Sequence, residues 1–463
     1  MSSSTRAGAH DHDPAPDAPD SGGDSGAAVV PGAPTPAQAG EQPAALQQPE
    51  PPELPLLSTL ADGLPPVVDT PEALERAADA LAAGSGPVAV DAERASGYRY
   101  GQDAQLVQLR RAGSGTWLVD PQALPDLGAL QTAMGGAEWV LHAANQDLPC
   151  LAGVGLRPGG DLFDTELGGR LAGYERVGLG AVVERLLGVR LAKEHSAVDW
   201  STRPLPEPWL LYAALDVELL VDLRDALAAD LADQGKLEWA RQEFAAVRDA
   251  PPTPPRTDPW RRVSGLHAVR QRRQLAAVRE LWLSRDELAR KRDTAPGRIL
   301  PDRAVVAAAQ AMPTSARDLA ALPVFSGPAN RRLGTRWMDA LDRARALPEA
   351  ELPPHSLPHE GPPPPRAWKD RDPEAAERLT RARAALTELA EELRLPVENL
   401  LSPDTVRRLC WQPPAGAADG AADGAGSVDD VDTAAVDAAL AASGARPWQR
   451  ELTAGLLARA LAG

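Results

Sequence analysis

Apolar and polar positions along the chain follow two different periods, and the shorter period predicts strands. Short apolar runs occur at residues 87–93, 104–111, 116–120, 138–143 and 161–165, with the length and boundaries typical of β-strands. Stretches with apolar residues three and four positions apart lie between or after these runs, at 124–134, 147–153, 179–188 and 207–234. Strands that alternate with helices in this way predict an α/β domain.

The second half of the chain has almost purely helical periodicity. Beyond residue 259 the apolar spacing is that of helices with glycine and proline stops, and proline-rich segments at 249–259 and 352–366 interrupt it. Because such segments separate compact regions, we expect an α/β domain at 56–248 and two small all-helical domains at 260–350 and 368–463.

Two further segments have the composition of disordered chain. Residues 1–55 are rich in Ser, Gly, Ala, Pro and Asp, and residues 413–430 consist mainly of Gly, Ala and Asp. Segments so poor in large apolar side chains bury too little surface to offset the entropy lost on ordering. We expect an acidic disordered tail and a flexible insertion within the last domain.

Charge is distributed unevenly. The 463 residues carry a formal net charge of −17, yet residues 251–350 contain 19 basic and 10 acidic side chains. A local excess of this kind carries more information about partners than the total charge does. The 2 cysteines, Cys150 and Cys410, lie far apart, which argues against a disulfide framework or a cysteine metal site. With no apolar run of membrane-spanning length and no signal-peptide pattern, we expect a cytoplasmic protein.

Carboxylates at three places in the α/β domain are candidates for chemistry. Asp91 and Glu93 share one face of a strand, because side chains alternate. Asp147 follows the run at 138–143, and Tyr212 and Asp216 share a helix face at i and i+4. Each has an alternative interpretation: the strand acids are solvated, Asp216 is a structural acid or cap, and Tyr212 packs in the core.

In order and spacing, these residues resemble the three motifs of the DEDD family of 3′-to-5′ exonucleases, in the subgroup with a tyrosine in the last motif. Asp91-x-Glu93 resembles the first motif, Asp147 the second, and Tyr212-x-x-x-Asp216 the third. The connecting segments "FDTELGGRLAG", "LGAVVERLLGV" and "DWSTRPL" resemble those of the ribonuclease D family. The resemblance extends over about residues 85–235. It implies a ribonuclease H-like fold of the DnaQ exonuclease type, with a mixed sheet.

The resemblance also implies a mechanism. Phosphodiester hydrolysis in such enzymes uses two divalent ions, Mg²⁺ or Mn²⁺, which favour oxygen ligands. Asp91, Glu93, Asp147 and Asp216 would bind the ions, with Asp91 bridging both. Tyr212 would orient the attacking water as a neutral phenol, since its reference pKa lies near 10.

Other residues of the domain are candidates for contacting substrate. His142 and Asn145 both precede Asp147 of the second motif. For His142, the alternative is a structural role. Lys193 and His195 precede "DWSTRPL", which contains Arg203, and this segment could approach the terminal nucleotide. The alternative is that Trp200 and Pro204 of this signature mainly pin the loop.

The helical region at 260–350 resembles the HRDC domain shared by RecQ-type helicases and ribonuclease D, and 368–463 resembles a diverged second copy. Candidate phosphate contacts in the basic segment are Arg261, Arg262, Arg270, Arg272, Arg273, Lys291 and Arg292. The alternative is an ordinary solvated helical surface.

We therefore predict a metal-dependent 3′-to-5′ exoribonuclease that releases nucleoside 5′-monophosphates from tRNA precursors and other structured RNA. The family implies a monomer and no membrane partner. Two alternatives are a DNA exonuclease of the Werner type and a catalytically silent RNA-binding scaffold, although the presence of all four acids and the tyrosine argues against the latter.

Overall fold

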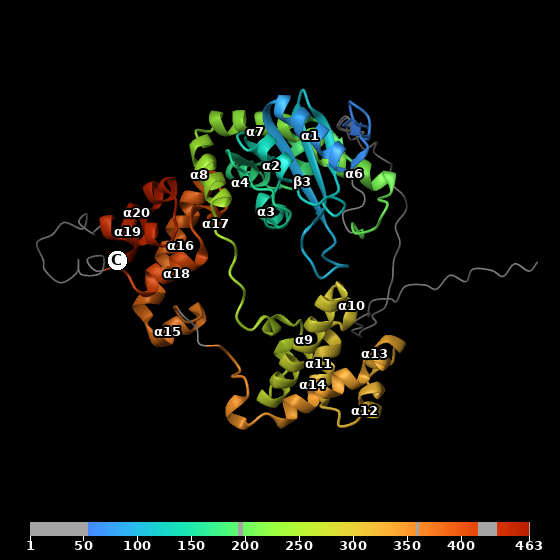
Figure 1. Ribbon diagram of the computed structural model, residues 1–463. Helices are drawn as coiled ribbons and strands as arrows, with labels where there is room; N and C mark the ends of the chain where they lie inside the picture. Colours follow the sequence, from blue (N-terminus) through green and yellow to red (C-terminus); the bar gives the residue numbers. More distant parts are fainter. Residues whose placement is uncertain (1–53, 193–197, 358–360, 415–432, 463) are drawn as a thin grey trace, which may run out of the picture. The chain divides into compact units, whose positions relative to one another are not determined.

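The computed structural model describes residues 54–192, 198–357, 361–414 and 433–462 (Figure 1). The predicted tail at 1–55 lies outside the described residues except for its last two positions. The predicted insertion at 413–430 lies outside them except for its first two. Lys193 and His195 also fall outside. Within the described part of the chain, no helix combines the length and apolar character needed to cross a bilayer.

A six-stranded sheet organises the first part of the chain, in the order β2-β5-β4-β3-β6-β7. Its strands are β2 (Val67–Val68), β3 (Ser85–Arg94), β4 (Ala104–Ala112), β5 (Gly115–Val119), β6 (Trp139–Leu141) and β7 (Leu162–Asp164). The three strands β3, β4 and β5 are antiparallel, whereas β2 pairs with β5, β6 with β3 and β7 with β6 in parallel. The expected mixed sheet and the five longer strands are thus confirmed.

Helices cover this sheet and bury its apolar positions (Figure 1). They are α1 (Pro71–Ala83), α2 (Gly128–Met134), α3 (Ala144–Gly153), α4 (Thr165–Leu171), α5 (Leu179–Leu187), α6 (Glu207–Glu218), α7 (Leu220–Asp233) and α8 (Leu237–Arg248). A separate parallel pair joins β1 (Leu56–Leu57) to β8 (Arg190–Leu191). One large core includes Val88, Val90, Val107 and Leu109 from the sheet. A smaller one, with Leu106, Leu118 and Trp200, lies under α6.

The single helix expected at 207–234 is in fact two. Leu219, with φ −107° and ψ 6°, separates α6 from α7, and its N–H bonds to the carbonyl of Val217. The helical i to i−4 bond is therefore lost at this point, although neither glycine nor proline is present. The interruption lets α6 keep its own face towards the sheet while Leu223, Leu227 and Leu231 of α7 stay buried.

The described residues from 259 onwards are mainly helical, as predicted, and form two further groups. The first contains η1 (Pro259–Arg262), η2 (Leu266–Ala268), α9 (Arg272–Arg292), α10 (Pro296–Ile299), α11 (Asp302–Ala311), α12 (Ala316–Ala321), η3 (Pro323–Phe325), α13 (Pro328–Arg332), α14 (Gly334–Ala346) and η4 (Glu349–Glu351). It packs around a core that includes Trp260, Leu281 and Trp337.

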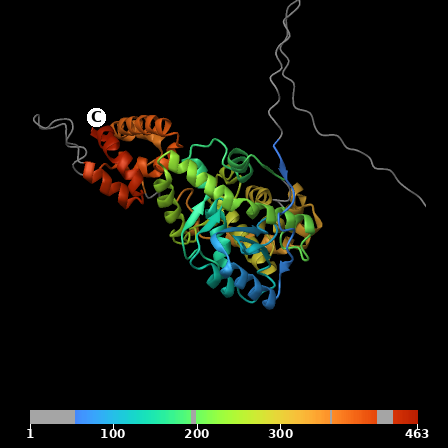
Figure 2. The same ribbon diagram turned by 90° about the horizontal axis from the view of Figure 1, so that it is seen from above.

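The second group contains η5 (Pro365–Ala367), α15 (Trp368–Arg371), α16 (Pro373–Leu393), α17 (Val397–Leu400), α18 (Pro403–Trp411), α19 (Thr433–Ala442) and α20 (Pro447–Ala462). Its helices pack against one another around Trp368, Leu386, Cys410 and Leu457, as the orange and red ribbons show from above (Figure 2).

Candidate active site

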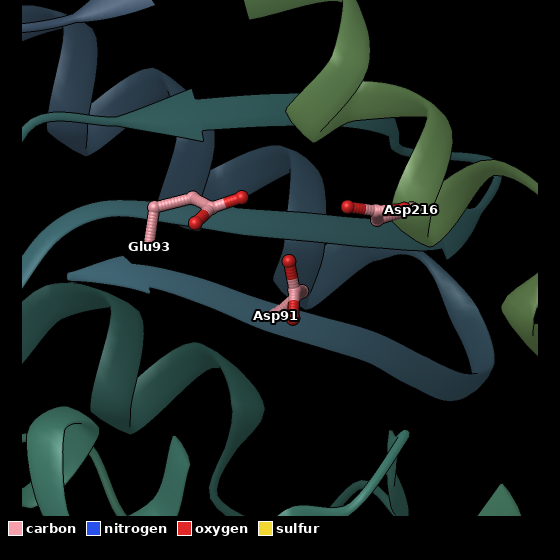
Figure 3. A group of neighbouring side chains, drawn as sticks. All are labelled: Asp91, Glu93 and Asp216. Carbon is pink, nitrogen blue, oxygen red and sulfur yellow. The ribbon is translucent and has the colours of Figure 1, made fainter. Parts of the chain in front are cut away.

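Three carboxylates from two elements point towards one another (Figure 3). Asp91 and Glu93 project from β3 and Asp216 from α6, and one carboxylate oxygen of each lies within 4.8 Å of the others. Three negative charges this close together repel one another, and their repulsion destabilises the fold. The arrangement therefore points to a positively charged ligand.

The sheet sets the direction of the two strand acids. Asp91 lies opposite Gln108 of β4 and Glu93 opposite Leu106, and an irregularity in the pairing follows directly after Glu93. Opposite residues of an antiparallel pair share a face, so both acids lie on the Leu106 face. Helix α6 packs on that same face, where Leu106 clusters with Leu215 and Tyr212. This packing brings Asp216 over the end of β3.

Asp147 reaches the site from the first turn of α3. Asp164 holds the start of that helix: its carboxylate accepts hydrogen bonds from the backbone N–H of Ala143 at 3.0 Å and Ala144 at 2.9 Å. The same carboxylate caps α4 through Glu166 N. Ala143 takes the left-handed conformation, φ 59°, that turns the chain from β6 into α3. The Asp164 side chain thereby stabilises a strained turn that fixes the position of Asp147.

These side chains line one cavity of about 270 Å³. Besides Asp91, Glu93, Asp147, Tyr212 and Asp216, its lining includes Ala92, His142, Ala143, Gln146, Leu179 and Leu220. The structure thus brings all five predicted motif residues together, although they come from three elements, β3, α3 and α6, that lie about fifty residues apart in the sequence. His142 joins them.

Burial raises the pKa of every carboxyl group in the cluster, and repulsion by neighbouring acids raises it further for Glu93, Asp147 and Asp216. Burial is the largest cause in each case, and it raises the pKa of Asp91 to about 6. Burial, and then the charge of Asp91, raise the pKa of Asp147 to about 8, although Arg94 lowers it in part. The pKa of Glu93 rises to about 9 through burial and then through repulsion by Asp91, Asp216 and Asp147. The pKa of Asp216 is also well above its usual value. The cluster lacks sufficient positive charge of its own.

The donor set fits a divalent cation. All of its atoms are carboxylate oxygens, the ligands preferred by hard ions such as Mg²⁺ and Mn²⁺. The cation among the described residues that lowers the pKa of Asp91, Glu93 and Asp147 is Arg94, whose Nη2 lies 3.8 Å from Asp147 Oδ1. One guanidinium does not balance four carboxylates, and a bound metal ion would.

Tyr212 and His142 are both neutral at physiological pH. Burial, and then the charges of Asp216, Glu93 and Asp91, raise the pKa of Tyr212, and its hydroxyl hydrogen-bonds Asp216. Burial lowers the pKa of His142 to about 4, and its Nδ1 lies 2.9 Å from Thr165 Oγ1. The site thus presents a phenol O–H and an uncharged imidazole beside the carboxylates.

The remaining predicted residues of this domain differ in placement. Asn145 is exposed on α3 and is not among the residues lining the cavity. Arg203 forms its hydrogen bonds within the domain. It donates to both carboxylate oxygens of Asp120 and to the carbonyls of Trp200, Thr202 and Gln105. These bonds tie the "DWSTRPL" loop to the sheet. Lys193 and His195 lie outside the described residues.

The seven basic candidates of the helical region divide into two kinds. Arg261 pairs with Asp258 and stacks on Trp260, Arg272 donates to the carbonyl of Leu352, and Arg273 to that of Arg345. These three arginines hold the helical group together. The other four are exposed: Arg262, Arg270, Lys291 and Arg292.

Sequence reasoning missed two residues that shape the site. Arg94 directly follows the first motif, and its position beside two acids was the available signal. Asp164 lies in the "FDT" segment, where an acid before Thr-Glu is a typical N-cap pattern. Its further bonds to the start of α3 depend on the pairing of β6 with β7 and have no sequence signal.

Family models match three segments of the chain. Residues 65–232 match "3'-5' exonuclease", residues 274–341 match "HRDC domain", and residues 361–461 match "3' to 5' exonuclease C-terminal domain". The first match contains all five motif residues.

Individual proteins are similar over longer spans. Ribonuclease D of Acidiphilium cryptum is 34% identical over 299 residues, which cover 62% of this chain and 74% of the relative. A crystal structure of a protein from Bifidobacterium adolescentis has a TM-score of 0.79 and 39% identity, covering 89% of this chain and all of that one. Escherichia coli RNase D, described as an exoribonuclease involved in structured RNA processing, has a TM-score of 0.59 and 26% identity, covering 74% of this chain and 89% of that one.

The mixed-sheet domain with its carboxylates, the HRDC match and these relatives lead to one conclusion: the chain belongs to the ribonuclease D family of 3′-5′ exoribonucleases.

Proposed function

We propose that this protein removes nucleoside 5′-monophosphates one at a time from the 3′ end of RNA, with Asp91, Glu93, Asp147, Tyr212 and Asp216 as its catalytic residues. The observation that carries this proposal is the convergence of three carboxylate oxygens within 4.8 Å, with Asp147 and Tyr212 in the same cavity. Repulsion among these carboxylates destabilises the folded protein. Such destabilising clusters are expected at functional sites.

We further propose two divalent ions, Mg²⁺ or Mn²⁺, as cofactors, held by Asp91, Glu93, Asp147 and Asp216. Four carboxylates carry the charge that two such ions require, and the raised pKa values support a cluster made for cations. When bound, the ions supply a nucleophilic water and stabilise the leaving oxygen of the phosphodiester.

The chain's own residues orient the reactants. Tyr212 keeps its proton, because its pKa is raised, so its hydroxyl can hydrogen-bond the attacking water and fix its direction but cannot act as a phenolate base. His142 is uncharged and bonded to Thr165, and its second ring nitrogen is available to the terminal nucleotide. Arg94, whose Nη2 lies 3.8 Å from Asp147 Oδ1, is the proposed cation for a phosphate oxygen.

The size of the cavity supports exonucleolytic action. At about 270 Å³ it lies at the lower end of ligand pockets, which suits one terminal nucleotide and not a duplex. We propose structured RNA, including tRNA precursors, as the substrate class. The similarity to Escherichia coli RNase D, described as acting in structured RNA processing, supports this assignment.

For the helical parts, we propose that 260–350 and 368–463 are two HRDC-type domains that follow the exonuclease domain at 56–248. Separate hydrophobic cores in the two helical groups support the division. Four exposed residues of the first, Arg262, Arg270, Lys291 and Arg292, are the proposed phosphate contacts. We further propose a cytoplasmic monomer. Both cysteines are free, which suits a reducing compartment.

The test is degradation of a 5′-labelled RNA with and without Mg²⁺ or Mn²⁺. We expect a ladder shortening from the 3′ end that requires the ion and is absent in Asp216→Asn. Asp222→Asn is the matched control, since Asp222 is exposed at the start of the next helix. A ladder from Asp216→Asn equal to that of the wild type would refute the assignment of the site. No product with any divalent ion would refute the proposed reaction.

A further inference from the structure

Gln108 is a buried amide for which the metal-free fold offers no partner. It lies in the middle of β4 with 0% of its surface exposed. Neither its Nε2 nor its Oε1 has a hydrogen-bond partner among the described residues. An unpaired buried amide group costs about 1–3 kcal/mol, and apolar residues of similar size would avoid that cost.

The strand register places this amide beside the carboxylate cluster. Gln108 pairs with Asp91 on β3 and with Leu118 on β5. Side chains at directly opposite positions share a face, with Cβ atoms about 5 Å apart. Gln108 and Asp91 are therefore neighbours on the face that α6 covers, where Leu106 and Leu118 belong to the apolar cluster.

Few polar groups lie around Gln108 on this face. Arg110, two positions along β4, already donates to Thr116 at 2.7 Å and pairs with Glu218 at 3.2 Å. Glu218 accepts in addition from the backbone N–H of Ala61 through Oε1, while among the described residues its Oε2 makes no hydrogen bond beyond the ion pair with Arg110. Leu118, on the other side, has no polar atom in its side chain. Asp91 is thus the cross-strand neighbour with a carboxylate that can accept from the amide.

We propose that Gln108 is a positioning residue for the metal site, whose Nε2 donates a hydrogen bond to the Asp91 carboxylate when a divalent ion is bound. This inference rests on the proposed function, because it assumes that Asp91 is a ligand. Ligating carboxylates are commonly fixed by a second hydrogen bond, and loss of such a bond weakens metal affinity by about 10–100-fold. Asp91 would hold the ion, and Gln108 would hold Asp91 in place, which gives the buried amide the partner that it otherwise lacks.

The experiment compares Gln108→Met with wild type in two readouts, Mn²⁺ affinity by calorimetry and the thermal midpoint of unfolding in chelator. Methionine keeps the length of glutamine and removes the donor. We expect Mn²⁺ affinity to fall by about 10-fold or more, while the metal-free thermal midpoint stays equal or rises. Leu109→Met is the matched control, since Leu109 is equally buried on the opposite face of the same strand. It should leave Mn²⁺ affinity unchanged.

Two results would overturn the proposal. Unchanged Mn²⁺ affinity in Gln108→Met would show that the amide does not serve the ligands. A lowered thermal midpoint in chelator would show that the amide is already bonded in the metal-free protein, for example to Glu218 or to a water molecule. Gln108→Leu repeats both readouts with a second apolar side chain, so that a packing defect of methionine cannot decide the outcome.

Asp91→Asn, measured in parallel, separates the two proposals. If Asp91→Asn binds Mn²⁺ as wild type does, the metal site itself is wrong. If Asp91→Asn loses binding and Gln108→Met keeps it, only the role of Gln108 fails.

Discussion

Replacing Glu93 by Gln should stabilise the metal-free protein while abolishing RNA degradation. Glutamine keeps the shape of the glutamate side chain and removes a carboxyl group that, beside Asp91 and Asp216, must either hold a proton at neutral pH or carry a repelled charge. Its amide also removes a carboxylate ligand that the proposed ions require. A substitution that raises stability and lowers activity together is the expected signature of a residue retained for function.

The magnitude follows from the geometry. Two charges no more than 4.8 Å apart repel by at least about 3 kcal/mol at an effective dielectric constant of 20. The pKa of Glu93 leads to a similar figure. Burial and three neighbouring acids raise that pKa from 4.5 to about 9, and holding a proton at pH 7 against a reference of 4.5 costs about 3 kcal/mol. Because Glu93 is only partly buried, we expect about 2 kcal/mol in practice.

The sign depends on pH in a defined way. Between pH 4.5 and about 9, Glu93 is protonated in the folded wild type but ionised in the unfolded chain. Wild-type stability therefore falls as pH rises through this window, whereas the amide that replaces the carboxyl group in the variant does not titrate. The stability difference between variant and wild type should be near zero at pH 4.5 and should grow as the pH rises towards about 9.

The assay is urea-induced unfolding in chelator at pH 5 and pH 8, beside Asp79→Asn as control, since Asp79 is exposed on α1. The control should change the free energy of unfolding by less than about 0.5 kcal/mol at either pH. If Glu93→Gln is no more stable than wild type at pH 8, or if its advantage persists undiminished at pH 5, the carboxylates do not repel as described and the reasoning fails.

Three further predictions concern other residues of the protein. Tyr212→Phe should lower kcat by about 100-fold or more with KM and the urea midpoint nearly unchanged; a fall in the midpoint that matches the loss of rate would mean a packing role instead. Asp164→Ala should lower the free energy of unfolding by about 3 kcal/mol and also reduce kcat, because the N–H groups of Ala143 and Ala144 lose their acceptor; wild-type urea unfolding would contradict the role of the turn. Substituting the four exposed cations of the first helical group by Ala should weaken RNA binding and reduce the slope of log affinity against log salt by about 0.7 for each cation that binds a phosphate, whereas Arg272→Ala should mainly lower stability; equal salt slopes in filter binding would contradict a phosphate-binding surface.

Much of the fold and of the candidate site could be predicted from local pattern. The strands ending near Arg94, Leu141 and Asp164 follow from apolar runs, and the helices from their periodicity. Tyr212 and Asp216 face the same way because they are one helical turn apart, which holds wherever the helix packs. Asp91 and Glu93 share a face for the corresponding reason in a strand. These features depend on residues close together in the chain, and so sequence alone predicted them.

The distribution of charge along the chain did not distinguish phosphate-binding arginines from structural ones. The count of basic residues at 251–350 treated all seven candidates alike, but Arg272 and Arg273 donate to backbone carbonyls of their own helical group. A guanidinium that satisfies the end of a helix or loop has the same sequence signature as one that faces solvent. Only packing tells the two apart.

By itself, the sequence determined the type of the five longer strands and of most helices, the family to which the motifs belong and the identity of the acids. The tertiary structure decided which distant groups meet: that Asp164 holds the start of the helix carrying Asp147, that Arg94 lies beside that acid, and that Gln108 faces Asp91 across two strands. Register and helix packing set these contacts, and both are fixed by the burial of apolar surface throughout the domain. The residues next to Asp164 and Gln108 in the sequence do not indicate which distant groups they meet.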